Sequence, residues 1–176
     1  MATSFGVELA NQSQVVKSDR SSHGRQSMLA KQENSFLQEI ENSVRDCTGA
    51  MVERHSSGLT VSASGPQGFS MSVMVENGRY AVYFDDWFEE FDCPETARQM
   101  FEAALKGEAR LKVDMLSGRR WRWTLERRDE TGTWHAESTT GHVIWRFWGR
   151  QSSVYLRNAF PPIMLPTDAA GRVRAN

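Results

Sequence analysis

The strongest constraint on the fold is an Asn77-Gly78 dipeptide between two runs of strand-forming residues, 69–75 and 80–84. Asn-Gly favours a two-residue type I′ turn, and this turn fixes the register of the two strands that it joins. The numbers of facing residues then sum to 155, so that Met71 faces Phe84. The other predicted pairs are Val73–Val82 and Val75–Tyr80 on the same apolar face, and Ser72–Tyr83 and Glu76–Arg79 on the more polar face.

A second hairpin is predicted where arginines and tryptophans alternate between residues 119 and 128, before a polar turn at 129–132. Alternation with a period of two is typical of a half-buried strand. A turn centred on Glu130-Thr131 pairs Leu125 with Ala136 and Glu126 with His135. The core face then carries Trp121, Trp123, Leu125 and Trp134. The outer face carries Arg122, Thr124, Glu126, His135 and Glu137, and a following strand adds Arg146 and Trp148 to it.

Two helices are predicted. Apolar residues recur every three or four positions between 29 and 47, which indicates one buried stripe. Asp92 and Glu95 form a capping box around Pro94, which predicts a helix that ends at Gly107. The remaining segments read as strands near 51–54, 59–63, 87–91, 109–115, 142–148 and 153–157. The expected fold is α+β, a mostly antiparallel β-sheet of hairpins with both helices packed on one face.

The expected organisation is one domain with two arms. Residues 1–28 are polar and nearly free of aromatic residues, so we expect a disordered arm. Residues 29–158 form the α+β domain, and 159–176 form a proline-containing C-terminal arm. Its apolar residues Phe160, Ile163 and Leu165 either fold back onto the domain or bind a partner.

Charge and composition narrow the classes of function. The net charge is −1, so no overall field attracts nucleic acid or an anionic membrane. Between residues 85 and 102 there are seven acidic residues and only one basic residue, Arg98. Among these acidic residues, Asp85, Glu89 and Glu90 are the candidate partner-binding residues. The alternative is that these acids are an ordinary solvated face. No signal peptide, membrane span or disulfide framework is recognisable, which favours a cytoplasmic protein with two reduced cysteines.

The side chains bear on three kinds of chemistry: nucleic-acid binding, acid–base catalysis and metal binding. An outer face with Arg120, Arg122, Arg146 and Trp148 suits single-stranded nucleic acid, although Glu126 and Glu137 place negative charge within it. A Glu126–His135 pair is able to orient a general base, but no nucleophile motif accompanies it. Histidine and cysteine spacing predicts no metal site, and nothing predicts a cofactor.

The expected function is therefore a non-catalytic protein-interaction module, such as an adaptor, an inhibitor, a chaperone or an assembly subunit. Its partner is another protein or a second copy of the chain. Single-stranded nucleic-acid binding is the first alternative, and a small enzyme that uses the Glu126–His135 pair is the second.

Overall fold

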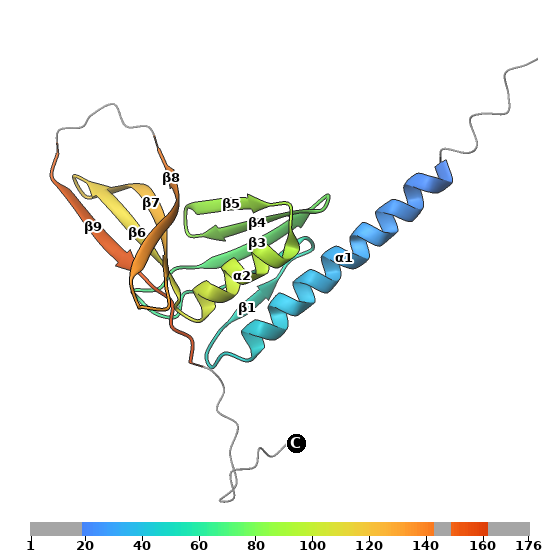
Figure 1. Cartoon of the computed structure of the whole chain (residues 1–176), viewed down its shortest axis with the longest axis horizontal. Coiled ribbons are helices and arrows are strands. Elements are labelled where there is room, and N and C mark those ends of the chain that lie inside the picture. The colour runs from blue at the N-terminus through green and yellow to red at the C-terminus, as the bar shows by residue number, and fades with distance from the viewer. Residues whose placement is uncertain (1–18, 143–148, 162–176) are drawn as a thin grey trace, which may run out of the picture.

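The structure, a computed structural model, describes residues 19–142 and 149–161 and shows two antiparallel sheets and two helices (Figure 1). The elements in chain order are α1 (Asp19–Arg45), β1 (Val52–Arg54), β2 (Gly58–Val61), β3 (Met71–Glu76), β4 (Arg79–Phe84), β5 (Trp87–Phe91), α2 (Pro94–Leu105), β6 (Ala109–Leu116), β7 (Arg119–Arg128), β8 (Trp134–Gly141) and β9 (Gln151–Leu156). The predicted α+β class with mostly antiparallel sheet is confirmed.

The five-stranded sheet has the order β1-β2-β3-β4-β5, and its strands follow one another along the chain. The predicted β3–β4 register is confirmed in full, including Met71 opposite Phe84. Asn77 and Gly78 have φ values of +53° and +76°, as a type I′ turn requires. Local turn chemistry was sufficient here because only two residues connect the strands.

Both helices lie on one face of this sheet, as predicted, and the N-terminal part of α1 projects beyond it (Figure 1). Phe36 and Ile40 of α1 and Phe101 of α2 pack against buried β3 and β4 residues. Two helix boundaries differ from the prediction. α1 begins at Asp19 rather than near residue 29, because a helix can continue through polar residues that precede the apolar stripe. The N-cap of α2 is Cys93 rather than Asp92, and no side-chain hydrogen bond caps the helix.

The four-stranded sheet has the order β8-β7-β6-β9. The inner faces of β6 and β7 supply Leu111, Val113, Trp123 and Leu125 to the core that the helices and the five-stranded sheet share. Residues 143–148, which make up most of the further strand predicted near 142–148, lie outside the described residues.

The predicted β7–β8 register is wrong. Leu125 faces Ser138 rather than Ala136, and Glu126 faces Ala136 rather than His135. The Gly132 N–H donates to Asp129 O, the Asp129 N–H donates to Thr133 O, and Gly132 has a φ of +87°. The turn therefore contains three residues rather than two. A bulge between Leu125 and Glu126 adds a second shift.

The longer turn and a further bulge in β7 also change the predicted faces. Trp123 and Leu125 are buried in the core as expected. Trp134 instead packs under the guanidinium of Arg110, which belongs to the outer face. Trp121 has no partner in the β6–β7 ladder because a second bulge lies there, and it stacks with the outer-face residue Arg122. Two of the tryptophans that were predicted to lie in the core therefore belong to the outer face.

Candidate functional site

The five-stranded sheet has one face that no helix or strand of the described residues covers. Alternation along β3, β4 and β5 places Met74, Ala81, Tyr83 and Phe88 on this face, and we call these four residues the apolar strip. Met74 and Tyr83 are each 37% exposed and Phe88 is 49% exposed. Large apolar side chains that gather on one uncovered surface indicate an interaction site more often than isolated ones do.

The strip is held in place by its own contacts. The rings of Tyr83 and Phe88 stack with centroids 5.9 Å apart and an angle of 24° between their planes. Their strands are hydrogen-bonded neighbours, so backbone pairing fixes this spacing. Thr140 Oγ1 donates to the Phe88 carbonyl oxygen at 3.3 Å, which ties the β5 side of the strip to β8. A partner would therefore meet a preformed surface.

Charged residues border one end of the strip. Arg79 Nη1 lies 3.5 Å from Glu90 Oε2, and Glu76 is exposed beside them. These three residues, with Asn77, line a hollow that also contacts Met74, Ala81 and Tyr83. The border carries two carboxylates and one guanidinium, so it has a small negative excess.

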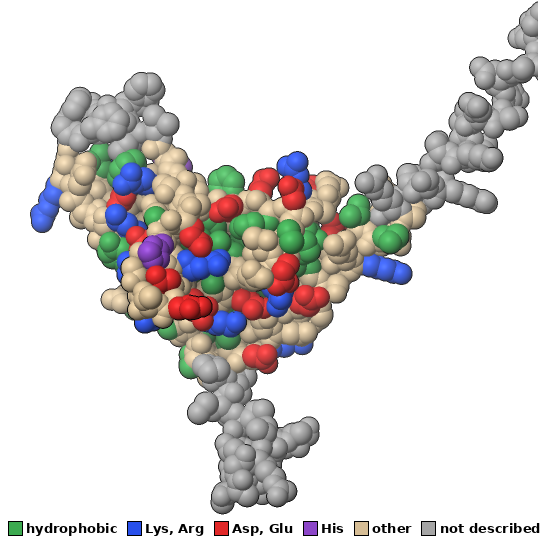
Figure 2. Space-filling view, in the orientation of Figure 1, with side chains coloured by type: hydrophobic (Ala, Val, Ile, Leu, Met, Phe, Trp, Pro, Cys, Tyr) green, Lys and Arg blue, Asp and Glu red, His purple; other side chains and the backbone are tan. Residues whose placement is uncertain are grey.

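The predicted acidic partner-binding residues do not form one surface. Asp85 lies in the β4–β5 turn, where its Oδ1 accepts hydrogen bonds from the Ser70 N–H and hydroxyl. Its Oδ2 lies 3.6 Å from Arg120 Nη1. Glu89 and Glu90 are successive residues of β5 and point to opposite faces. Of the three, only Glu90 borders the apolar strip. Figure 2 shows acidic and basic side chains interspersed on the visible side of the molecule.

The start of the C-terminal arm folds onto its own domain. Phe160 is 7% exposed, and its N–H donates to the Leu105 carbonyl oxygen at 3.5 Å. This placement agrees with the fold-back alternative, because so buried a side chain reaches a partner only by leaving the core. Ile163 and Leu165 lie outside the described residues.

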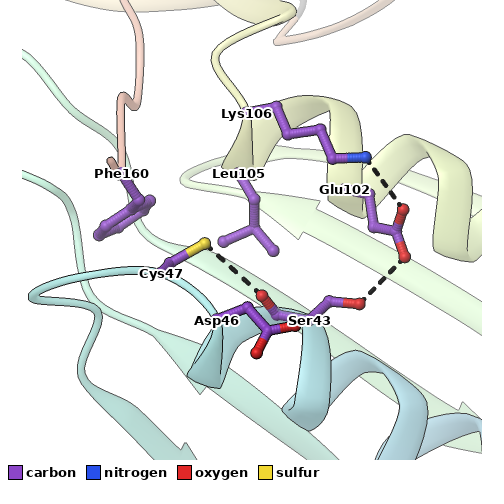
Figure 3. A pocket seen from close by; sticks show the side chains of 7 residues that line it. All are labelled: Ser43, Asp46, Cys47, Glu102, Leu105, Lys106 and Phe160. Atoms are coloured by element: carbon purple, nitrogen blue, oxygen red, sulfur yellow. Dashed lines mark hydrogen bonds and ion pairs between the residues drawn. The ribbon is translucent and has the colours of Figure 1, made fainter. Parts of the chain in front are cut away.

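Phe160 also lines a pocket between the end of α1 and the end of α2 (Figure 3). Ser43 Oγ donates to Glu102 at 3.0 Å, and Lys106 Nζ approaches the same carboxylate at 3.4 Å. Burial and the neighbouring Asp46 raise the pKa of the Cys47 thiol. A thiol with a raised pKa is a poor nucleophile, so the pocket does not point to thiol catalysis.

The outer face of the four-stranded sheet combines aromatic and basic side chains. The guanidinium of Arg110 lies 4.3 Å from the ring centroids of both Trp134 and Tyr155. Its Nε also donates to Glu126 Oε2 at 2.6 Å. Arg122 stacks on Trp121 at 4.8 Å. The guanidinium groups of Arg110 and Arg122 are thus already engaged by rings and carboxylates of this chain.

A buried carboxylate organises the middle of this face. Asp114 is 7% exposed, accepts a 2.6 Å hydrogen bond from Ser153 Oγ and pairs with Arg122 Nη2 at 2.6 Å. Burial by itself would raise the pKa of Asp114, but the hydrogen bonds from Ser153 and Arg122 outweigh it and the pKa is lowered. Asp114 therefore carries a negative charge within the basic surface.

The predicted nucleic-acid residues are only partly placed. Arg120 reaches toward Asp85 of the other sheet, whereas Arg122 lies on the outer face with Asp114. Arg146 and Trp148 lie outside the described residues. Sequence reasoning missed that Trp121 and Trp134 join the outer face, because neither the bulge at Trp121 nor the third residue of the turn before Trp134 leaves a clear mark in the alternation.

The predicted Glu126–His135 pair does not form. Glu126 pairs with Arg110, and His135 Nε2 lies 2.7 Å from Asp129 Oδ2. Asp129 holds its own turn, since its other oxygen accepts hydrogen bonds from Thr131 and from the Thr133 N–H. Hydrogen bonds from Thr131, His135 and Thr133 lower the pKa of Asp129. The His135–Asp129 contact is thus part of an exposed turn.

Within residues 19–142 and 149–161, no group of three or more histidine, cysteine or acidic residues is arranged to hold a metal ion. No helix in this part of the chain is long and apolar enough to cross a membrane. Comparison with protein-family models, curated proteins and solved structures gives no significant match.

Proposed function

We propose that this protein is a non-catalytic protein-interaction module whose partner docks on the apolar strip. The observation that carries the proposal is the exposure of Met74, Tyr83 and Phe88 on a sheet face that the described residues leave uncovered. Burying a fully exposed side chain of this size contributes roughly 1.5–3 kcal/mol, so covering the exposed 37–49% of each of these contributes a fraction of that amount. Aromatic residues are frequent anchors of interfaces.

The chemistry of the partner follows from the strip and its border. Because the strip is apolar, its occupant is a protein surface with apolar side chains of its own. Arg79 and Glu90 already pair with each other, and Glu76 is a further exposed carboxylate in the hollow that Met74 lines. A partner with a basic side chain beside its apolar patch would complement this border.

The test compares two variants as bait for affinity capture from native lysate, with and without nuclease. Tyr83→Ser combined with Phe88→Ser removes both aromatic rings of the strip. Met51→Ser removes a side chain that is 69% exposed elsewhere on the surface and serves as the matched control. Circular dichroism establishes that each variant is folded.

We expect the double variant to lose a nuclease-resistant protein partner that wild type and Met51→Ser retain. The purified partner should then bind the double variant at least about tenfold more weakly, because anchor residues cost more than about 1 kcal/mol when truncated. Retention of every partner by the double variant would contradict the proposal.

Single-stranded nucleic-acid binding is the second candidate, favoured by Trp121, Trp134 and Tyr155 on the outer face of the four-stranded sheet. Exposed rings and arginines are what such binding requires. Asp114 and Glu126 oppose it, because each occupies a guanidinium that a phosphate would need. We therefore expect no oligonucleotide binding tighter than about 10⁻⁴ M at physiological salt.

Fluorescence anisotropy with single-stranded oligonucleotides at several salt concentrations distinguishes the two candidates. A sub-micromolar complex that weakens steeply with salt, and that Trp134→Ala abolishes, would replace protein interaction with nucleic-acid binding as the main function.

A further inference from the structure

The outer edge of β9 differs from the other sheet edges. β9 is the last strand of the four-stranded sheet, and no strand of the described residues pairs with its outer side. Its sequence, Gln-Ser-Ser-Val-Tyr-Leu, contains no charge, and residues 151–155 are all exposed. Each of the other edge strands carries charged residues: Glu53 and Arg54 in β1, Glu89 and Glu90 in β5, and Glu137 in β8. Charged side chains on an edge oppose pairing with another strand, and β9 lacks them.

The ladder with β6 shows which backbone groups of β9 are free to pair. The Ser117 N–H donates to Arg150 O, so the backbone of Arg150 points toward β6. Because hydrogen-bonding direction alternates along an antiparallel strand, Gln151, Ser153 and Tyr155 point their N–H and C=O groups to the outer edge. The Arg157 N–H, next in this series, is taken by Gln67 O at 2.8 Å. Within the described part of the chain, the stretch whose outward backbone groups have no partner therefore runs from Gln151 to Tyr155, with Ser153 at its centre.

We infer that this edge pairs with the same edge of a second copy, antiparallel, about a two-fold axis at Ser153. Ser153 then faces Ser153 of the second copy, Gln151 faces its Tyr155, and Ser152 faces its Val154. All of these pairs are uncharged. Val154 and Tyr155, which are 43% and 49% exposed in the single chain, become partly covered. The two four-stranded sheets join into one continuous sheet.

The charges that flank β9 and the direction of its free backbone groups favour a second copy of this chain as the partner, in the register centred on Ser153. A shift of one residue in either direction would turn the free backbone groups away from each other, and in one direction it would also place Arg150 opposite Arg157 of the second copy. Like charges that face each other across strands are destabilising. The register centred on Ser153 avoids both problems and makes the edge complementary to itself, which a two-fold interface requires.

The first test is the concentration dependence of the mass of the full chain, by sedimentation velocity from about 1 to 200 µM, because an interface of this small size is weak. We expect reversible formation of a species of twice the 20.0 kDa chain mass. Two variants report the register. Ser152→Lys with Val154→Lys places lysines opposite each other and should raise the dissociation constant at least about tenfold. Ser152→Glu with Val154→Lys places opposite charges there and should return it to within about threefold of wild type.

Amide hydrogen exchange tests the pairing of the β9 edge in the wild-type protein, without any substitution. The Ser153 N–H should gain protection as concentration rises, whereas the Val154 N–H, which belongs to the β6 ladder, should not change. A monomer at all concentrations overturns the inference, even if another protein from lysate binds this edge. A dimer that survives the double lysine variant, or that leaves Ser153 unprotected, also overturns it. The apolar strip is untouched in these experiments, so their failure leaves the proposed function standing.

Discussion

The side-chain amide of Asn158 satisfies both backbone groups of Phe69. Asn158 Nδ2 donates to the Phe69 carbonyl oxygen at 2.8 Å, and its Oδ1 accepts from the Phe69 N–H at 3.1 Å. Asn158 is fully buried and follows β9, while Phe69 precedes β3. Asn158 and Phe69 are 89 residues apart in the chain, and their hydrogen bonds connect the two sheets through a buried polar contact.

Replacing Asn158 with alanine should lower the free energy of unfolding by about 2–4 kcal/mol. The change leaves two buried backbone groups of Phe69 without their partners, and each such group costs about 1–3 kcal/mol. Urea unfolding followed by circular dichroism measures the loss. Asn34→Ala, on the exposed face of α1, is the control and should change stability by less than about 0.5 kcal/mol.

Two tryptophans that are two residues apart should respond differently to alanine. Trp123 is 2% exposed in the core, so Trp123→Ala should cost about 3–5 kcal/mol. Trp121 is half-buried on the outer face beside Arg122, so Trp121→Ala should cost less than about 1.5 kcal/mol. Chemical denaturation of both variants measures the difference. Equal losses would mean that the bulge at Trp121 is not present in solution.

Alanine substitutions at two glycines with positive φ, Gly118 and Gly107, should distinguish the cost of backbone strain from the cost of a steric clash. A Cβ on Gly118, whose φ is +80°, would meet nothing within 4 Å. A Cβ on Gly107, whose φ is +70°, would lie 2.6 Å from the Asn158 backbone oxygen. Gly118→Ala should therefore cost about 1 kcal/mol from backbone strain alone. Gly107→Ala should cost at least about 1 kcal/mol more by thermal or urea unfolding, because the backbone of Asn158 would have to move.

Asp114 should make stability depend on acid pH. Its pKa is lower in the folded protein than in the unfolded chain, so its contribution is complete above the unfolded value of about 3.9. That contribution is lost as the pH falls through the folded pKa. Asp114→Asn should flatten the curve of unfolding free energy against pH below about pH 5. Asp86→Asn, in the exposed β4–β5 turn, is the comparison and should leave more of the acid slope in place.

How far the candidate site could be predicted is visible in Tyr83. Its pairing with Ser72 was predicted correctly, and so was its place on the face of β4 that points away from the core. The apolar character of that opposite face was not predicted, because Phe88 reaches it from β5 and Met74 from β3. Reading β3, β4 and β5 together for residues on the less buried face would have given the strip.

The local sequence by itself determined the β3–β4 hairpin, the two helices and the antiparallel α+β class. In each case the information lies in neighbouring residues: the positive φ values that Asn77-Gly78 tolerates, and the apolar spacing that buries one face of a helix. Tertiary structure decided the rest. The three-residue turn at 130–132 separates Glu126 from His135 and moves Trp134 outward, and the bulge at Trp121 moves that ring to the outer face. A bulge inverts the faces of every later residue in its strand, so alternation alone does not reveal which side chains share a surface.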